Sequence, residues 1–510
     1  MYIPDFSDPA LSALLNDRGL TRRGETFLDL LRKFFDRVKD YPNMTAVEKN
    51  QAWRYLTEGR LMPATQLLVG ATAPDKSVGS CTVIDFDLSQ PSRTFELLEE
   101  RSILGEGVGI DLTKTANPAA TAQAINERLK VLSDKLRAEK QRPPALMLTC
   151  SSDHPRVEEF CRVKAGADLN DWVANISVKI ESVDGLLRLM DTVSNGIHSN
   201  GEPGVLFSSE IDESNPNPEM PYVSTAPCAE AMLALDEQCV FVTVNVAAHI
   251  RDGQVDFDDF GDSCYIAALL ANAVIDNAPN LSISTKYKRK IGIGLCGLHT
   301  ALIYLGLEYE KSERLSSDLG EILSFRTKFA SMQVAKRSNP YPGFSASRWN
   351  EPRWRENKFR AKAGRIPVFE WIELMSQITL NGLANASTVC FPPTGVSSDI
   401  LGVSKSYEPH FALNNRQGIA STRQEKVPAE VTWANDAGVS ESVLKTALQI
   451  SPQNHLRIHR AFSKWSDDSG SKTVNLPEST TPGDISRLLL DSWDAGVKGL
   501  TMFREGCIDA

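Results

Sequence analysis

Residues 225–230 read Thr-Ala-Pro-Cys-Ala-Glu, and a second cysteine, Cys239, follows eleven positions after Cys228. A proline fixes the backbone before Cys228, and Glu230 stands two residues after it. On an extended loop, side chains two residues apart project to the same side. Such a thiol can take hydrogen from a carbon while the carboxylate accepts the proton of the adjacent hydroxyl. The tetrapeptide from Pro227 to Glu230 is also common in structural turns, so the rest of the chain must decide between the two interpretations.

Outward from this stretch, short apolar segments alternate with longer helical ones. This alternation predicts an α/β fold with parallel strands. The first 60 residues are expected to be a helical region, and residues 61–510 the main α/β part, with a polar surface insertion at 335–366. Strands are expected at 145–148, 175–178, 204–207, 241–245 and 388–391, and helices at 259–278, 297–306, 312–337, 367–384, 440–450 and 484–495.

The composition limits the class of protein. The 510 residues carry a formal net charge of −10, which argues against a broad nucleic-acid-coating surface. Nine cysteines are too few for a disulfide scaffold in a chain of this length. No apolar run approaches the ~18 residues of a membrane span. We therefore expect a soluble, cytoplasmic protein.

Three patterns suggest other sites and have simpler interpretations. Residues 292–297 fit G-x-G-x-x-G, but a charged segment stands where a dinucleotide fold has a strand, so these glycines are expected to let a helix pack closely. A Rossmann-type dehydrogenase remains the less favoured alternative. Residues 105–109 lack the lysine of a P-loop. His455 and His459 lie four apart on a basic segment and are expected on a solvated helix face, so no metal site is predicted.

The stretch around Cys228 resembles the active-site loop of ribonucleotide reductase large subunits, which usually reads Asn-Pro-Cys-Gly-Glu. Further segments resemble the same family in the same order, so together they are far more specific than any one alone. They are 62–65 with 79–81, 105–111, 201–207 with 215–216, 289–294 with 297–298 and 305–306, 393–398 with 402–404 and 408–409, 471–477, and 499–506. The resemblance covers about residues 60 to 506. The brevity of the regulatory regions is similar to that of viral members of the family.

The resemblance implies a fold and a mechanism. The fold would be a ten-stranded α/β barrel of two parallel halves, with a central finger loop carrying the reactive cysteine and an N-terminal helical cap. Cys228 would carry a thiyl radical, Glu230 would act as base, and Cys81 with Cys239 would be oxidised to a disulfide, converting ribonucleotides to 2′-deoxyribonucleotides for DNA synthesis. Expected substrate-binding residues are Thr65, Ser80, Thr225, Pro393, Thr394, Gly395, Val396 and Ser397.

The partners follow from the same resemblance. A ribonucleoside di- or triphosphate would be the substrate, and thioredoxin-like proteins would reopen the disulfide, directly or through Cys507. Phe503 and Met502 stand where members with a separate metal-containing subunit carry a tyrosine pair, so adenosylcobalamin is the expected radical source. A ferritin-like partner subunit is the alternative, and a homodimer is possible. The short region 112–135 suggests reduced effector control.

Two residues depart from the usual loop. Ala226 replaces an asparagine whose amide helps hold the substrate, and Ser224 or Thr225 could substitute for it. Ala229 replaces a glycine, which predicts an ordinary φ there in place of a positive one. These departures leave open a nucleotide-binding relative that has kept the fold and lost the chemistry.

Overall fold

The computed structural model describes residues 4, 6–7, 9–17, 20–21, 24–73, 76–139, 141, 143–167, 171–278, 280–359, 364–417 and 424–507. The chain divides into two compact units, each built from separate stretches of sequence. Unit 1 comprises Met1–Gly79 and Cys239–Ile450, and unit 2 comprises Ser80–Gln238 and Ser451–Ala510. The N-terminal helices therefore belong to the same unit as residues 239–450.

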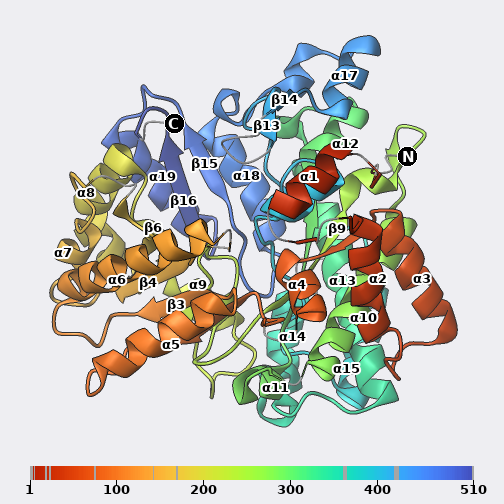
Figure 1. Ribbon diagram of the computed structural model, residues 1–510, viewed down its shortest axis with the longest axis horizontal. Coiled ribbons are helices and arrows are strands. Elements are labelled where there is room, and N and C mark those ends of the chain that lie inside the picture. Colours follow the sequence, from red (N-terminus) through yellow and green to blue (C-terminus); the bar gives the residue numbers. More distant parts are fainter. Residues whose placement is uncertain are drawn as a thin grey trace. The chain divides into compact units, whose positions relative to one another are not determined.

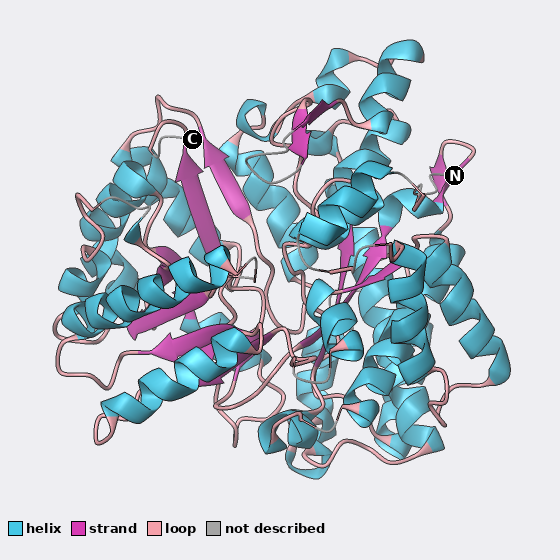
Figure 2. Ribbon diagram, viewed as in Figure 1, coloured by secondary structure: helices cyan, strands magenta, loops and turns pink. Residues whose placement is uncertain are grey.

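Unit 2 is built on a seven-stranded sheet of order β15-β16-β6-β5-β4-β3-β2. Figure 2 draws the strands in magenta. Its five strands β2 to β6 are parallel, β16 pairs with β6 in the antiparallel sense, and β15 is parallel to β16. The strands are β2 (Cys81–Ile84), β3 (Gly107–Asp111), β4 (Leu146–Ser151), β5 (Ala174–Ile180), β6 (Gly204–Phe207), β15 (Thr473–Leu476) and β16 (Gly499–Arg504). The predicted α/β class with a large parallel sheet is confirmed.

Helices connect these strands and cover one face of the sheet (Figure 1). In β5 the alternate residues Ala174, Ile176, Val178 and Ile180 join the core formed with the helices, whereas 175, 177 and 179 point to the other face. The helices of unit 2 are α5 (Pro91–Ile103), α6 (Pro118–Ala138), α7 (Val157–Cys161), α8 (Val183–Asn200), α9 (Ser208–Ser214), α18 (Pro452–Ser463) and α19 (Pro482–Asp494). Of these, α9 does not join that core but packs Ile211 against Leu206 and Met232.

Side-chain caps start several of these helices. Ser182 accepts a hydrogen bond from the Gly185 N–H at the start of α8, and Thr481 forms a capping box with Asp484 at the start of α19. The left-handed Gly201 ends α8 and turns the chain toward β6. Local sequence therefore sets the limits of the connecting helices.

Unit 1 contains a small sheet of order β1-β9-β12, surrounded by helices. Strand β1 (Leu61–Pro63) is antiparallel to β9 (Val240–Asn245), and β12 (Ile291–Cys296) is parallel to β9. The expected strand at 388–391 forms only an isolated parallel bridge, between Val389 and Ile293. The hairpins are β10 (Ile250–Arg251) with β11 (Gln254–Val255) and β13 (Asn415–Gln417) with β14 (Gln424–Lys426).

The helices of unit 1 follow the predicted periodicity except at 440–450. That segment forms two short 3₁₀ turns, Glu441–Leu444 and Ala447–Gln449, instead of the expected α-helix. The segment 335–366 carries α14, and the buried Trp349 donates a hydrogen bond to the Ala386 carbonyl (2.9 Å). The helices are α1 (Pro9–Asp17), α2 (Phe27–Val38), α3 (Ala46–Thr57), α4 (Thr65–Thr72), α10 (Phe257–Asn277), α11 (Ile283–Lys288), α12 (Leu298–Tyr304), α13 (Glu313–Arg337), α14 (Pro352–Phe359), α15 (Val368–Asn381), α16 (Gly395–Leu401) and α17 (Ala429–Asp436).

Candidate active site

Cys228 lies at the tip of a hairpin in unit 2, formed by β7 (Ser224–Thr225) and β8 (Met232–Leu233). We call residues 224–233 the Cys228 hairpin. The Ala226 N–H donates to the Ala231 carbonyl (2.9 Å), and the Ala229 N–H donates to the Ala226 carbonyl (2.9 Å). The tip is thus a tight turn and not an extended loop. The Cys228 side chain is exposed, whereas Glu230 is only 3% exposed.

The expectation of an ordinary φ at Ala229 is wrong. Its φ is +60°, in the left-handed region that favours glycine. The turn that closes through the hydrogen bond between Ala229 and Ala226 requires this conformation. The hairpin therefore keeps its shape in spite of the substitution of alanine for the usual glycine.

Two glycines of β3 make room for the hairpin on the uncovered face of the sheet. A Cβ at Gly109 would lie 2.2 Å from the Thr225 carbonyl oxygen. A Cβ at Gly107 would lie 2.7 Å from the Pro227 ring and 3.1 Å from the Cys81 Sγ. The glycine-rich segment 105–109 therefore runs into a strand, in which Gly107 and Gly109 form the seat of the hairpin, and Cys81 borders that seat.

Polar side chains hold the hairpin on this seat. Ser224 Oγ lies 3.1 Å from Thr149 Oγ1 on β4. Lys179 on β5 donates to the Val223 carbonyl (3.4 Å) and forms an ion pair with Asp111 on β3 (3.1 Å). The Thr225 hydroxyl donates to the Ala226 carbonyl (2.6 Å). Both hydroxyls that could have substituted for the missing asparagine are thus engaged within the protein.

Glu230 is held by a segment that the sequence reasoning did not single out. The Ser469 N–H donates to the Glu230 carbonyl (3.0 Å). The segment around Ser469 is held in turn by the buried Lys498, whose ammonium donates to the carbonyls of Ser466 (3.1 Å), Asp467 (2.9 Å) and Asp468. Lys498 directly precedes the 499–506 motif, and its burial could not be read from the sequence.

Cys81 begins β2 directly opposite Gly107 and is 6% exposed. The next residue, Thr82, forms an antiparallel bridge with Gln238, which directly precedes Cys239 in the chain. Gln238 also donates from its side chain to the buried Glu106, which lies 3.6 Å from Arg101. The segment that leads to Cys239 is therefore fixed against the strand that carries Cys81.

The remaining predicted site residues fall in both units. Ser80 and Thr225 lie in unit 2 with Cys228, whereas Thr65, Cys239 and residues 393–397 lie in unit 1. Thr65 opens α4, and residues 395–397 open α16. Thr394 has a positive φ of 55°, and its hydroxyl accepts a hydrogen bond from the Ser406 N–H (2.7 Å). A tight turn thus precedes α16.

Cys507 is half-buried near the end of the described chain. Burial raises the pKa of its thiol, an effect that hydrogen bonding and the charge of Arg504 only partly oppose. A raised pKa lowers the thiolate fraction and so disfavours exchange with a disulfide. A relay role for Cys507 stays a prediction.

The expectation for the glycines at 292–297 is wrong in its detail. Gly292 and Gly294 lie within β12 itself, and only Gly297, with a φ of +75°, precedes a helix. A Cβ at Gly292 would lie 2.4 Å from the Cys390 Sγ, and one at Gly294 would lie 2.6 Å from the Cys390 carbonyl oxygen. These glycines let a strand, not a helix, pack closely. In a dinucleotide fingerprint the glycines follow the strand instead.

The expected solvated face at His455 and His459 is also wrong, because both side chains are fully buried. Lys472 Nζ lies 3.0 Å from His455 Nδ1, and His459 Nε2 lies 2.9 Å from the Gly499 carbonyl. Burial lowers the pKa of His459 to about 4, so its ring is neutral and donates to that carbonyl. Among the residues that the structure describes, no group of three or more His, Cys, Asp or Glu side chains could hold a metal ion.

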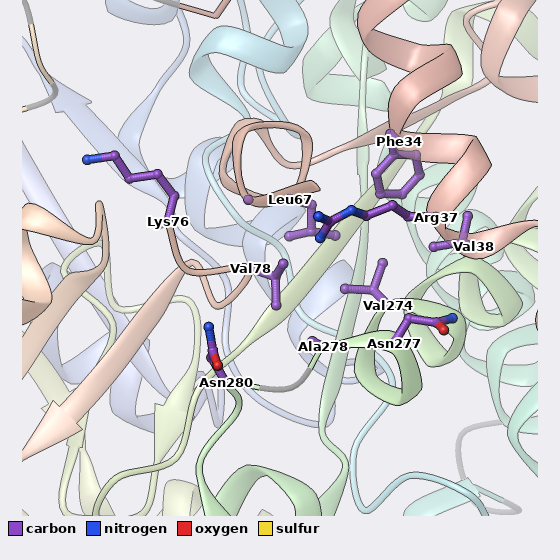
Figure 3. A pocket seen from close by; sticks show the side chains of 11 residues that line it. Phe34, Arg37, Val38, Leu67, Lys76, Val78, Val274, Asn277, Ala278 and Asn280 are labelled. Atoms are coloured by element: carbon purple, nitrogen blue, oxygen red, sulfur yellow. The ribbon is translucent and has the colours of Figure 1, made fainter. Parts of the chain in front are cut away.

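Unit 1 also contains a cavity of about 130 Å³ (Figure 3). Its walls are formed mainly by apolar side chains of α2, α4 and α10, and Arg37 extends from α2 toward Leu67. None of the predicted site residues lines it. In the part of the chain described by the structure, no helix is long and apolar enough to cross a membrane.

Comparison with known proteins identifies a family and relatives of this chain. Residues 168–503 match the family model described as "Ribonucleotide reductase, barrel domain". A vitamin B12-dependent ribonucleoside-diphosphate reductase of Mycobacterium tuberculosis (strain CDC 1551 / Oshkosh) is 27% identical over 422 residues, covering 72% of this chain and 57% of that protein. A vitamin B12-dependent ribonucleotide reductase of Streptomyces coelicolor is 22% identical over 560 residues, covering 86% of this chain and 57% of that protein.

Unit 2 is thus an α/β fold with a large, mainly parallel sheet that carries a cysteine-bearing hairpin seated on strand glycines. The chain belongs to the ribonucleotide reductase barrel-domain family, whose model matches about two thirds of its length. It spans a little over half the length of the curated relatives named above.

Proposed function

We propose that this chain reduces ribonucleotides to 2′-deoxyribonucleotides by thiyl-radical chemistry. The observation that carries the proposal is the Cys228 hairpin. Its tip presents an exposed thiol, and the carboxylate two residues on is buried. The hairpin is seated on strand glycines beside a second cysteine, Cys81. The names of the relatives, which are ribonucleotide reductases, support the same activity.

Each proposed residue has one task. Cys228 loses a hydrogen atom to the radical source and then takes the 3′ hydrogen of the substrate. Glu230 accepts the proton of the 3′-hydroxyl, so that water can leave from C2′ once a neighbouring thiol has protonated it. Cys81 and Cys239 give up two electrons and two protons in total and form a disulfide. Cys228 then returns a hydrogen atom to C3′.

The pairing of Cys81 with Cys239 has support from the register of the chain. Thr82 and Gln238 form an antiparallel bridge, and in that register the next pair would be the residue before Thr82 and the residue after Gln238. Directly opposed residues have Cα separations of about 4.5–5.5 Å, which suits a disulfide. An external thioredoxin-like protein would reopen the disulfide.

The finer details of the fold and of the substrate site stay proposals. The five parallel strands of unit 2 would be one half of the ten-stranded barrel, and the Cys228 hairpin would be its central finger. Thr65, Ser80, Thr225 and residues 393–397 would bind the substrate, with its phosphates at the turn before α16. The substrate would be a ribonucleoside di- or triphosphate, and a homodimer is proposed.

Adenosylcobalamin is the proposed radical source, because the relatives named above are described as vitamin B12-dependent. The residues present fit a radical source that approaches from outside the chain, since the Cys228 thiol is exposed. When bound, the cofactor would supply a carbon-centred radical able to abstract the thiol hydrogen. The task of the chain is to hold that thiol in place. A ferritin-like partner subunit is the alternative source.

Anaerobic turnover with dithiothreitol tests the proposal. A ribonucleotide mixture is incubated with the wild-type protein, with Cys228→Ser and with Cys264→Ala, each with and without adenosylcobalamin. Cys264 is a suitable control because it is buried in α10 of unit 1, where burial keeps its thiol protonated. We expect deoxyribonucleotides from the wild type and Cys264→Ala only when the cofactor is present, and none from Cys228→Ser. Equal activity of Cys228→Ser would contradict the mechanism.

A further inference from the structure

Asn175 is an exposed polar residue inside a strand whose other residues are mostly buried. It lies on β5, paired with Met147 of β4, and its side chain points to the face of the sheet that holds the Cys228 hairpin. The alternate residues of β5 that point the other way are apolar and belong to the core. The side chain of Asn175 therefore has no packing role in that core.

The amide of Asn175 contacts the hairpin at one atom. Its Nδ2 donates to the Pro227 carbonyl oxygen at 3.1 Å. Only the nitrogen end of the amide can face a carbonyl oxygen, so chemistry fixes this orientation. The Pro227 carbonyl belongs to the peptide group that joins Pro227 to Cys228, and a peptide group is a rigid plane that includes both Cα atoms. Holding this oxygen therefore holds the Cα of Cys228.

The strand position of Asn175 is itself fixed. The next residue, Ile176, donates its N–H to the Glu202 carboxylate (3.3 Å), which also lies 2.6 Å from the buried Lys164 ammonium. Ser177, two residues on, lies opposite Gly204 of β6. This gives the Gly201-Glu202-Pro203-Gly204 motif a physical task, because Glu202 anchors the end of β5 from which Asn175 reaches the hairpin.

Resting on the proposed function, we propose that Asn175 is a positioning residue for the reactive thiol: its side-chain amide fixes the peptide group between Pro227 and Cys228. The Ser224 and Thr149 hydroxyls and the Lys179 ammonium hold the base of the hairpin. Asn175 contributes a polar side chain that holds its tip. The thiol itself stays exposed, so the restraint acts through the backbone and leaves the sulfur accessible to substrate.

Three variants test this role in the full-length protein. Asn175→Ala removes the donor, and Asn175→Asp keeps the shape but turns an acceptor toward the Pro227 carbonyl. Asn175→Thr introduces a residue that favours strands, but its hydroxyl is one bond too short to reach the Pro227 carbonyl. This variant keeps the test decisive if Asn175→Ala folds poorly. Asn195→Ala is the matched control, because Asn195 is exposed on α8 and its amide donates only within that helix, to Asp191.

The first readout is amide hydrogen exchange of the peptide covering residues 223–233, which requires neither cofactor nor turnover. We expect all three Asn175 variants to speed exchange there by roughly two- to tenfold, as the loss of one hydrogen bond permits, with Asn195→Ala unchanged. Unchanged exchange in the Asn175 variants would overturn the inference whatever the activity of the protein. A negative result in this experiment therefore counts against the role of Asn175 and not against the proposed function.

The second readout is turnover of a ribonucleoside diphosphate with adenosylcobalamin and dithiothreitol. A misplaced thiol should lower kcat by roughly ten- to a hundredfold while KM stays within about twofold, because the variants leave the proposed substrate-binding side chains in place. A general loss of folding would instead lower the amount of active protein and the melting temperature. Wild-type kcat in Asn175→Asp would contradict the inference while leaving the proposed function intact.

Discussion

Ala229 holds a backbone conformation that is unfavourable for any residue with a Cβ. Its φ of +60° costs about 1 kcal/mol relative to glycine. We predict that Ala229→Gly raises the free energy of unfolding by about that amount and leaves turnover in place, since the turn is unchanged. Urea unfolding measures the effect. Ala231→Gly is the control at a buried neighbour with an ordinary φ, where the same change should destabilise the protein.

Gly109 is required by the close approach of the hairpin. A methyl group there would lie 2.2 Å from the Thr225 carbonyl oxygen, so Gly109→Ala must push β7 away from the sheet. We predict a loss of about 1–3 kcal/mol in the free energy of unfolding and a larger relative loss of turnover, because the displaced element carries Cys228. Gly483→Ala on α19, where the nearest atom lies at 3.7 Å, should leave turnover unchanged and raise the free energy of unfolding by up to about 1 kcal/mol. Equal effects at the two positions would rule out this explanation.

The ion pair of Glu48 and Arg337 joins α3 to α13 within unit 1. The Arg337 guanidinium donates to both Glu48 carboxylate oxygens (2.8 and 2.9 Å), and Tyr265 donates to one of them (2.7 Å). Burial raises the pKa of Glu48, but the hydrogen bonds from Arg337, Tyr265 and Thr45 outweigh it and hold the pKa at about 2. The carboxylate is therefore a stabilising link between the two helices at neutral pH.

Glu48→Gln should therefore reduce the free energy of unfolding by about 2–3 kcal/mol at pH 7. The folded pKa lies below the unfolded value of about 4.3, so this contribution is complete above that pH and is lost as the pH falls toward 2. Urea unfolding at pH 7, 5 and 3 should show the two proteins converging. Asp36→Asn removes an exposed pair on α2 and should cost under about 1 kcal/mol. A difference for Glu48→Gln that does not shrink with acid would contradict the assignment.

Elements with strong periodicity were predictable, and those shaped by tertiary contacts were not. The long helices near 259–278 and 312–337 were expected from their sequence and appear as α10 and α13. Residues 388–391 have the composition of a strand, but only Val389 pairs. The segment 440–450 breaks into two 3₁₀ turns, whose N-cap residues are Ser440 and Thr446. The sequence pattern indicates which secondary structure a segment prefers, and the packing around the segment decides which one it adopts.

The site was predictable from the sequence only as a set of reactive side chains. Cys228 and Glu230 could be named from their spacing and from the ordered family resemblance. Their supports could not be named, because Asn175, Gly109 and Lys498 become meaningful only when the fold brings them to the hairpin or to the segment behind it. Ala229 misled the sequence reasoning, since the statistical preference of alanine is weaker than the closure of a hydrogen-bonded turn.

On the scale of the whole molecule, buried histidines set the response to acid. His249, His299 and His459 are each 0% exposed, and each neutral ring contacts a backbone carbonyl, of Asn245, Val443 and Gly499 respectively. Burial is the largest cause that lowers their pKa values, to about 4, 3 and 4. In the unfolded chain the same rings have pKa values near 6.5. The folded protein therefore excludes protons that the unfolded chain accepts.

The sign of the linkage follows from this difference. Because the folded pKa values are depressed, the stabilising contribution is complete above about pH 6.5 and is lost as the pH falls toward 4. For each of these histidines, the free energy of unfolding should fall by about 2 kcal/mol between pH 7 and pH 5. His459→Gln keeps a donor for the Gly499 carbonyl and does not titrate, so its stability should fall less steeply than that of the wild type over this interval. Urea unfolding at pH 7, 6 and 5 measures the two slopes, and parallel curves would show that His459 is not protonated on unfolding.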